Sequence, residues 1–308
     1  MGVNNMKLGI VGLGNWGIRA AREAVDLLKE QKIDDLYLCD LDESRFEEFT
    51  RYNVTTDFEE MLTKVDGVHI CTQNKSHFEM GKKALDMNKH ALIEKPFTSK
   101  QTQAFDLLEI AAERDLVLQV GHIFRFANIT KKLRELNKKK TFGDIYHINL
   151  DWTHFMKPMD NTDVLWDLLP HPLDILHFIT SQWPSQISGI IKNIRFSNVE
   201  EMAVLQAKYE SDLSANIHIS WINPIKRRRV EIIGSEKSAV AECVKQTLNI
   251  YENDGSINEI PVESNNTIRE ELLNFINSIL SGKNSNNSGI LGLRTVELIE
   301  KLQNDLFC

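Results

Sequence analysis

The chain has 308 residues, more than one ordinary hydrophobic core supports and typical of two domains. Hydrophobic residues make up 42% of it and charged residues 26%, which excludes a disordered or fibrous class. The net charge of -8 opposes binding to nucleic-acid phosphates and to anionic membranes, so neither kind of partner is expected.

The cysteines and the first residues indicate the compartment. Cys39, Cys71, Cys243 and Cys308 are scattered and form no CxxC pair, so neither a metal site nor a disulfide framework is predicted. No apolar run reaches the roughly 18 residues of a membrane span. Residues 1–5 lack the basic and apolar parts of a signal peptide and are interpreted as an untargeted leader. Together these features predict a cytoplasmic protein.

The first part of the chain alternates short β-branched runs with amphipathic stretches of helical period, the pattern of βαβ units around a parallel sheet. The expected strands cover residues 7–11, 36–40, 67–71, 91–93 and 117–121. The expected helices cover residues 16–30, 76–87 and 99–114. This pattern predicts an α/β Rossmann domain with a parallel sheet over residues 1–122.

After Gly121 strands begin to follow one another without helices between them, which implies an α+β domain with a large, mainly antiparallel, open-faced sheet. The clearest strands are 145–154 and 215–221, the second with alternating polar and apolar residues. The expected helices cover residues 130–137, 168–180, 268–280 and 293–306. A Ser-, Asn- and Gly-rich loop at 281–289 is expected to be mobile. We therefore predict a substrate-binding and oligomerisation domain over residues 123–308.

A glycine-rich turn follows the first expected strand and opens the first expected helix. It reads Gly12-Leu13-Gly14-Asn15-Trp16-Gly17 and matches GxGxxG. The first glycine permits the tight turn, the second lets a pyrophosphate approach the backbone, and the third lets helix and strand pack closely. The helix N-terminus offers free N–H groups to the anion. We interpret this turn as a dinucleotide site that a side chain at Gly14 would block.

Asp40 ends the second expected strand, 23 residues after Gly17 (40 minus 17). The acid that holds the adenosine ribose hydroxyls of NAD lies about 20 residues after the glycines. A 2′-phosphate would meet acidic groups here, because Asp42 and Glu43 follow and Arg45 is the only nearby cation. The predicted cofactor is therefore NAD, with NADP disfavoured.

Three further stretches, in this order, resemble a known family. They are Glu94-Lys95-Pro96, Val120-Gly121-His122, and Asp167-Leu168-Leu169-Pro170-His171-Pro172-Leu173-Asp174. With the glycine turn they resemble the Gfo/Idh/MocA family, named after glucose-fructose oxidoreductase, inositol dehydrogenase and rhizopine catabolism. The residues at 14–17 and 164–168 look most like members that oxidise nucleotide-linked amino sugars. The chain departs from the family pattern at Gln73 and Ile129, where proline is common.

The resemblance implies that Lys95, Asp167 and His171 form the catalytic group and contact the substrate. Oxidation of a secondary alcohol needs a base, and imidazole suits this role near neutral pH. Lys95 would stabilise alkoxide charge, and Asp167 lies one helical turn before His171. Since proline is tolerated in the first helical turn, Pro170 predicts a helix that begins near Asp167, with His171 near its positive end.

The resemblance also implies contacts to cofactor and substrate outside these residues. Expected on the cofactor side are Glu94 at the nicotinamide ribose, Lys95 near the nicotinamide, Thr72, Asn74 and His77. Arg125 and Asn128 lie where the substrate pocket of a family member begins and are candidate polyol contacts.

Structural alternatives exist for several of these residues. Asp167 would also fit a helix N-cap, Lys95 a solvated loop lysine, and His171 a hydrogen-bonded core histidine. The basic run at 226–229 is expected to be a solvated hairpin shoulder, the alternative being a contact to a phosphate-bearing substrate or an acidic neighbouring subunit.

The sequence thus predicts an NAD-dependent oxidoreductase that transfers hydride between a ring hydroxyl of a sugar, amino sugar, nucleotide sugar or cyclitol and the nicotinamide. Two alternatives stay open: a non-catalytic NAD-binding sensor or regulator of the same fold, and an NADPH-dependent reductase of an imine or enone. Family analogy and the prevalence of symmetric oligomers predict a homodimer or homotetramer through the C-terminal sheet.

Overall fold

The computed structural model describes residues 6–159, 162–283 and 285–307, so the predicted leader at 1–5 lies outside the described residues. The chain divides into two compact units. Unit 1 comprises residues 1–123 and 266–297, and unit 2 comprises residues 124–265 and 298–308. No helix in the described part of the chain is both long and apolar enough to cross a membrane.

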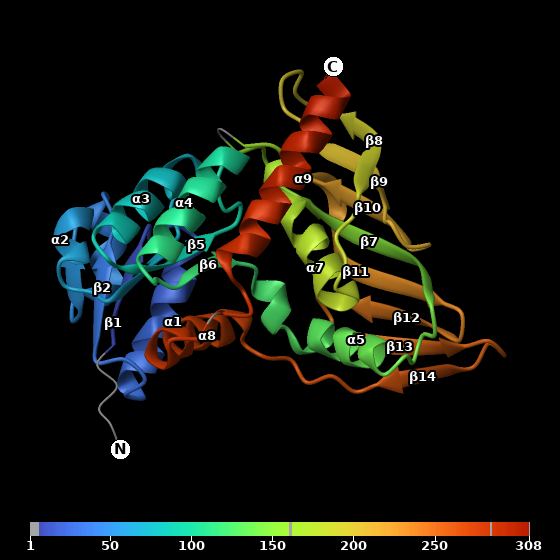
Figure 1. Ribbon diagram of the computed structural model, residues 1–308, viewed down its shortest axis with the longest axis horizontal. Coiled ribbons are helices and arrows are strands. Elements are labelled where there is room, and N and C mark those ends of the chain that lie inside the picture. Colours follow the sequence, from blue (N-terminus) through green and yellow to red (C-terminus); the bar gives the residue numbers. More distant parts are fainter. Residues whose placement is uncertain (1–5, 160–161, 284, 308) are drawn as a thin grey trace. The chain divides into compact units, whose positions relative to one another are not determined.

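Unit 1 is built on a parallel sheet with the strand order β3-β2-β1-β4-β5-β6 in the described residues (Figure 1). Its strands are β1 (Lys7–Val11), β2 (Asp35–Cys39), β3 (Asn53–Thr55), β4 (Gly67–Ile70), β5 (His90–Glu94) and β6 (Leu118–Gly121). This is the Rossmann order, in which the direction of winding reverses between β1 and β4 and opens a crevice for a ligand. The predicted parallel sheet is confirmed, and β3 was missed because it has three residues and little apolar character.

The helices of unit 1 cover the sheet. In α1 the residues that face the sheet include the small apolar Ala20, Ala21 and Ala24, which are buried. They are α1 (Gly17–Lys29), the 3-10 helix η1 (Glu43–Phe49), α2 (Phe58–Leu62), α3 (Asn74–Asp86), α4 (Gln101–Glu113) and α8 (Thr267–Ser281). The last helix, α9 (Gly289–Phe307), contributes residues to both units.

Residues 266–297 belong to unit 1, although the sequence predicted them in the second domain. Leu272, Phe275 and Ile276 of α8 are buried in the same core as β1 and α1, and α8 lies beside α1 in Figure 1. Burial of these apolar side chains therefore brings the segment back to the first unit.

The loop at 281–289, expected to be mobile, is packed where it meets β6. Asn287 is fully buried and its side-chain amide donates to Val120 O, while Ser288 forms an antiparallel bridge with Gln119. Because β6 is an edge strand, its free backbone groups need partners, and the polar loop supplies them. The expectation of mobility is wrong for this part of the loop.

Unit 2 contains a second sheet with the order β14-β13-β12-β11-β7-β10-β9-β8 in the described residues. Its strands are β7 (Ile145–Phe155), β8 (Gln186–Lys192), β9 (Met202–Lys208), β10 (Ser214–Ser220), β11 (Ile222–Gly234), β12 (Lys237–Glu242), β13 (Thr247–Glu252) and β14 (Ile257–Ile260). Neighbouring strands are antiparallel except for β7 and β10, which pair in parallel. The predicted mainly antiparallel sheet is confirmed.

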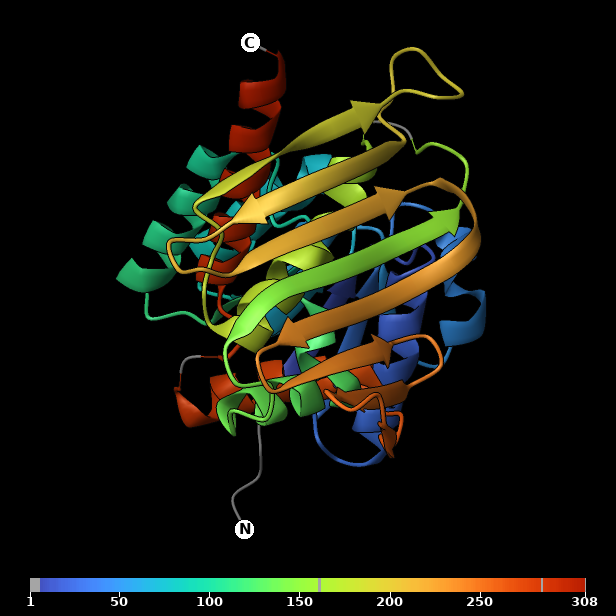
Figure 2. The same cartoon turned by 90° about the vertical axis from the view of Figure 1, so that its right-hand side faces the viewer.

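One face of this sheet is covered by helices and the other is open, as Figure 2 shows from the open side. The helices of the unit are the 3-10 turn η2 (Ile123–Phe126), α5 (Asn128–Lys138), α6 (Val164–Leu168) and α7 (Pro170–Thr180). Leu150, Trp152 and Ile217 point to the covered face and are buried, whereas Asn216 and Arg227 belong to the open face and are exposed. This alternation is the period-two pattern expected of a sheet with one solvated side.

The helix predicted at 168–180 begins differently from the expectation. Two short helices, α6 and α7, meet at Leu169, and the N-cap is Asp163, whose carboxylate accepts hydrogen bonds from Leu165 N (2.8 Å) and Trp166 N (3.0 Å). Asp167 lies inside α6, so the N-cap alternative for it is wrong. Pro170 is the first residue of α7, where its missing N–H leaves no hydrogen bond unmade.

Candidate active site

A cavity of about 1210 Å³ lies at the carboxyl ends of β1, β2 and β4 in unit 1. Six predicted cofactor residues line it together: Gly12, Gly14, Asn15, Trp16, Asp40 and Thr72. This is the reversal point of the strand order, where α/β sheets bind their ligands. Lys75 and Ser76 also line the cavity and were missed by the sequence analysis, although their position directly after β4 was a usable signal.

The three glycines of the turn meet different surroundings. A Cβ on Gly17 would lie 1.8 Å from Gly12 O, and Gly12 has a φ of +87° and closely abuts Thr72. Beside Gly14, in contrast, no described atom beyond its chain neighbours lies within 4 Å of the Cβ position. Two glycines therefore serve the protein's own packing, and the third leaves space for a ligand at the backbone.

The start of α1 is equipped to bind an anion. Trp16 precedes the helix and makes no side-chain cap hydrogen bond to it, while Ile18 N and Arg19 N already donate to Gly14 O (3.0 Å) and Trp16 O (2.9 Å). In the described part of the chain, the donors left for an anion are therefore the backbone N–H groups just before Ile18. Together with the space beside Gly14, this helix end fits the pyrophosphate of a dinucleotide.

Asp40 is fixed at the edge of the cavity by the backbone. Its carboxylate accepts hydrogen bonds from Leu13 N (2.6 Å) and Asp42 N (3.0 Å). Arg45, the cation nearest in sequence, has its Nε 3.4 Å from the Asp42 carboxylate. The acid is thus oriented while the neighbouring cation is already paired, an arrangement suited to ribose hydroxyls.

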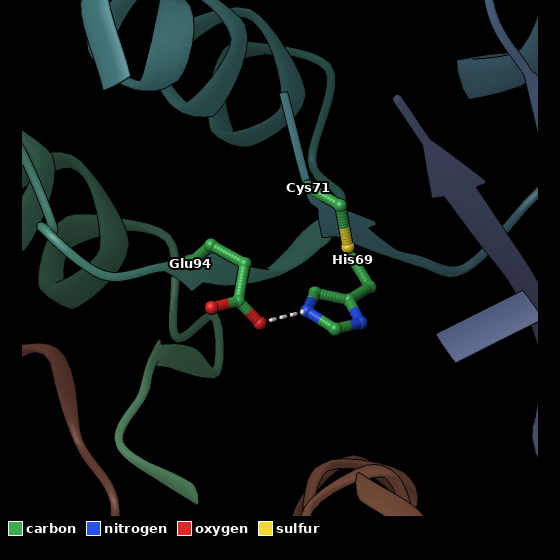
Figure 3. Close-up of side chains that lie close together, drawn as sticks. All are labelled: His69, Cys71 and Glu94. Carbon is green, nitrogen blue, oxygen red and sulfur yellow. Dashed lines mark hydrogen bonds and ion pairs between the residues drawn. The ribbon is translucent and has the colours of Figure 1, made fainter. Parts of the chain in front are cut away.

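Glu94 links the glycine turn to the loop that carries Lys95. Its Oε1 accepts a hydrogen bond from Trp16 Nε1 (2.6 Å) and lies 3.0 Å from His69 Nε2, and its Oε2 lies 3.3 Å from Lys95 N. Figure 3 shows the side chains of His69, Cys71 and Glu94 converging from neighbouring strands. Sequence reasoning missed His69, which is fully buried on β4 and carries no motif.

His69, Cys71 and Glu94 are residue types that bind zinc, and their candidate donor atoms lie within 4.8 Å of one another. However, Glu94 Oε1 already contacts two hydrogen-bonding groups. Burial raises the pKa of the Cys71 thiol well above its usual range, and the charges of Glu94 and Glu271 act in the same direction. These observations favour a hydrogen-bonded network over a metal centre.

His77 holds two loops together below the cavity. Its Nδ1 lies 2.8 Å from Pro96 O and its Nε2 lies 3.1 Å from Thr72 O. Burial lowers its pKa, against the opposing effect of these backbone contacts. Both ring nitrogens are engaged by the backbone, so His77 supports the residues beside the cofactor position. Asn74, the first residue of α3, has a buried Oδ1 without a hydrogen-bond partner in the described part of the chain.

Unit 2 surrounds His171 with aromatic rings. His171 is the second residue of α7 and partly buried, and its ring is edge-on to Phe124 at 5.1 Å between centroids. Trp152 of β7 lies 6.1 Å from the same ring and 4.7 Å from Phe124. The imidazole is therefore oriented by packing from two sides.

Asp167 is held by a long-range hydrogen bond. Its carboxylate accepts from Trp221 Nε1 at 2.9 Å, and Trp221 itself is fully buried. Since Asp167 and His171 lie in consecutive helices joined at Leu169, the single helix turn expected between them is replaced by this junction.

Arg125 and Asn128, the candidate polyol contacts, are engaged within unit 2. Arg125 is 7% exposed, and its guanidinium lies 2.6 Å from Asp174 Oδ1 and 2.8 Å from His177 Nδ1. Asn128 begins α5 and donates its side-chain amide to Glu263 O (3.1 Å). These contacts occupy polar atoms that a sugar hydroxyl would need.

The basic run at 226–229 lies within β11 and is not a hairpin shoulder. Arg228 places its guanidinium 5.0 Å from the Trp152 ring centre and donates to Thr153 O (2.9 Å) and to His154 Nδ1 (3.1 Å). Burial lowers its pKa to about 10, while Asp167 acts in the opposite direction. The solvated interpretation is wrong for Arg228. Its spacing of two and four residues from the apolar Val230 and Ile232 already indicated that all three share one face of the strand.

Two family models match the chain. One, described as "Oxidoreductase family, NAD-binding Rossmann fold", matches residues 6–122, and the other, the "GFO/IDH/MocA C-terminal domain", matches residues 130–240. The chain belongs to the Gfo/Idh/MocA oxidoreductase family. The resemblance deduced from the motifs is thus confirmed, and the protein is an oxidoreductase with an NAD(P)-binding Rossmann unit.

Individual members of the Gfo/Idh/MocA family are similar over most of this chain. A UDP-N-acetylglucosamine 3-dehydrogenase from Acidithiobacillus ferrooxidans is 26% identical over 302 residues, covering 95% of this chain and 94% of the relative. The scyllo-inositol 2-dehydrogenase (NADP(+)) IolW from Bacillus subtilis is 24% identical over 251 residues, covering 77% and 69%.

Solved structures share the fold. The structure of the Acidithiobacillus ferrooxidans enzyme GnnA has a TM-score of 0.87 and covers 97% of each chain, with 24% identity. An oxidoreductase from Agrobacterium radiobacter, in complex with NAD+, L-tartaric acid and magnesium, has a TM-score of 0.85 at 15% identity and covers 97% of this chain and 96% of its own.

Proposed function

We propose that this protein is an NAD-dependent dehydrogenase that transfers hydride between a ring hydroxyl of a sugar, amino sugar, nucleotide sugar or cyclitol and the nicotinamide. The observation that carries the proposal is the cavity of unit 1, where the glycine turn and Asp40 meet at the reversal point of the sheet. Similarity to a UDP-N-acetylglucosamine 3-dehydrogenase over 95% of the chain supports a sugar-like substrate.

NAD is proposed over NADP on electrostatic grounds. The carboxylate of Asp40 is fixed at the cavity edge, and Asp42 follows it with Arg45 paired to it. A 2′-phosphate at this edge would face the Asp40 charge without a free cation from Arg45. A preference for NADPH would instead favour the imine or enone reductase alternative.

In the proposed mechanism, bound NAD supplies the hydride acceptor, held by the glycine turn and the start of α1. His171 takes the hydroxyl proton of the substrate, since imidazole titrates near neutral pH. Lys95 stabilises the developing alkoxide, and Asp167, oriented by Trp221, bonds the substrate or the imidazole. Glu94 is oriented by Trp16 and is proposed to reach the nicotinamide ribose.

The proposal includes a homodimer or homotetramer that forms through the open face of the unit 2 sheet. Helices of its own unit do not cover this face (Figure 2). The face exposes Ile190 and Val204, which are cross-strand neighbours. Symmetric oligomers of this kind are common. A monomeric mass by light scattering would refute this part. A cytoplasmic location is also proposed, because the described cysteines are free.

Turnover decides between the enzyme and the sensor. We expect NADH formation from NAD with at least one member of a panel of UDP-sugars, free sugars and inositols. Lys95→Met should lower kcat by about 100-fold or more, because it removes the cation opposite the alkoxide. Lys100→Met, at an exposed position before α4, is the matched control and should retain activity. Tight NAD binding without turnover on any candidate would favour the sensor.

A further inference from the structure

Arg228 occupies a position that belongs to the core. In β11, residues 228, 230 and 232 point to the covered face of the unit 2 sheet, and Val230 and Ile232 are fully buried. Arg228 is the cross-strand partner of Trp152, which is fully buried as well. A charged side chain thus stands in a row of core positions, where an unpaired cation is unfavourable.

No carboxylate of the described residues lies next to the charge of Arg228. Arg125 pairs with Asp174 and Arg229 approaches Glu231 and Glu242, whereas no carboxylate in the described part of the chain lies within 4.0 Å of the Arg228 guanidinium. Asp167 is the acid that attracts it from a longer distance. A partly buried cation of this kind is stabilised when a ligand brings an anion to it.

Hydrogen-bonding capacity is also left on this side chain. A guanidinium has five N–H donors. Within the described residues, Arg228 donates three bonds, to Thr153 O, Arg227 O and His154 Nδ1, so two of its N–H groups remain there for a further acceptor (five minus three). The existing bonds tether the guanidinium to neighbouring backbone and imidazole atoms, with its central carbon 5.0 Å from the centre of the Trp152 ring.

The position of Arg228 relates it to the proposed catalytic residues of the same unit. The Arg228 guanidinium lies 5.0 Å from the centre of the Trp152 ring, and the centre of the same ring lies 6.1 Å from that of the His171 ring. Trp221, adjacent to the start of β11, binds the Asp167 carboxylate. Arg228, His171 and Asp167 therefore belong to one neighbourhood on the covered side of the sheet.

We propose that Arg228 is a substrate-binding residue that receives an anionic group of the substrate, either the diphosphate of a nucleotide sugar or the carboxylate of a sugar acid. Guanidinium groups bind both anions through two parallel hydrogen bonds. This inference rests on the proposed function and narrows its substrate class from ring alcohols in general to ring alcohols with a negative charge. Neutral sugars and inositols are then poor substrates.

Matched substitutions on the two faces of β11 test this proposal. Arg228→Met removes the charge and keeps an apolar side chain against Trp152, and Arg227→Met removes the same charge from the exposed face. The substrates are UDP-N-acetylglucosamine, D-glucuronate and neutral N-acetylglucosamine, assayed with saturating NAD. Arg228→Met should raise KM for whichever anionic substrate is used by about 10- to 100-fold and change KM for the neutral sugar by less than about twofold. Arg227→Met should change neither.

The same assay shows which of the two anions Arg228 binds, because UDP-N-acetylglucosamine carries the diphosphate and D-glucuronate carries the carboxylate. Equal increases in KM for charged and neutral substrates would indicate a packing role and overturn the proposal. So would an Arg228→Met enzyme that keeps its affinity for both anions. If Arg228→Met does not fold by circular dichroism, Arg228→Lys retains the charge without the planar fork and should lose about tenfold on the anionic substrate only.

Binding measured without turnover keeps this inference separate from the proposed function. Calorimetric titration with UDP and with D-glucuronate, in the presence of NAD, should show binding to the wild type that weakens in Arg228→Met. If no sugar is oxidised but this difference appears, hydride transfer is refuted and the anion site stands. If neutral sugars are oxidised and neither anion binds the wild type, the proposed function stands and the anion site is overturned.

Discussion

The cofactor side of unit 1 and the candidate catalytic side of unit 2 are built in different ways. In unit 1, one continuous turn from Gly12 to Gly17 supplies the backbone surface, and Asp40 directly follows the next strand. In unit 2, the surroundings of His171 and Asp167 come from η2, β7, β11 and the residue that follows β10. A site made from local backbone geometry is visible in a sequence, whereas a site made from distant side chains emerges only in the folded unit.

The largest expected effect separates two glycines of the same turn. Gly17→Ala should destabilise the protein by about 3 kcal/mol or more, because the new Cβ would overlap Gly12 O at 1.8 Å. Gly14→Ala should leave the free energy of unfolding within about 1 kcal/mol and weaken NAD binding by about tenfold or more. Urea unfolding and NAD titration measure the two effects. Equal losses of stability would mean that Gly14 also serves packing.

A pH-dependent prediction concerns the helix cap of unit 2. Burial is the main cause that raises the pKa of Asp163 from 3.8 to about 6, against its hydrogen bonds to the backbone. The folded state thus binds a proton more tightly than the unfolded state, so the stabilising contribution of this group is complete below pH 3.8 and is lost as pH rises through about 6.

Asp163→Asn keeps a good N-cap without the charge. The variant should match the wild type near pH 4 and exceed its free energy of unfolding by about 1 to 3 kcal/mol near pH 8. Denaturant unfolding at the two pH values measures this difference. A difference that does not change with pH would show that the charge of Asp163 is not the cause.

Trp221→Phe tests the long-range assembly of unit 2. It keeps an aromatic ring in the core and removes the N–H that binds Asp167. We expect a loss of about 1 kcal/mol in stability and about a tenfold fall in kcat, with little change in KM for NAD. Unchanged kinetics would show that Asp167 is oriented without Trp221.

The smallest effect is expected at His69, where unit 1 uses a distant side chain as unit 2 does. His69→Gln replaces the imidazole beside Glu94 by an amide and should raise KM for NAD by about three- to tenfold while kcat changes less. Trp16→Phe removes the other neighbour of Glu94 Oε1 and serves as the comparison. Identical kinetics in wild type and His69→Gln would remove His69 from the site.

Much of unit 1 could be predicted because its signals are local. The strands, the turn and Asp40 are read from runs of a few residues, and the parallel order follows from the alternation with helices. His69 gave no signal, since its contact to Glu94 joins two strands across the sheet. The return of residues 266–297 to unit 1 was also hidden, because an apolar helical face does not reveal which core it joins.

Unit 2 was predictable as a sheet but less as a site. The catalytic candidates came from family motifs, and Arg125 lay in the expected stretch but pairs with Asp174, which is distant in sequence. The sequence did not single out Arg228, because it belongs to a run of four basic residues and such a run suggests a solvated surface. In a strand, consecutive side chains alternate between the two faces of the sheet. Val230 is buried, so Arg228, two residues earlier, points to the same inner face.

The contribution of α8 to the core of unit 1 has a consequence for how the chain is made. Leu272, Phe275 and Ile276 reach that core only after residues 124–265 of unit 2 have been synthesised. The nascent cofactor unit therefore leaves the ribosome with an apolar gap beside α1, a surface that chaperones recognise. The cofactor unit, although first in the chain, is completed only after the ribosome has translated α8.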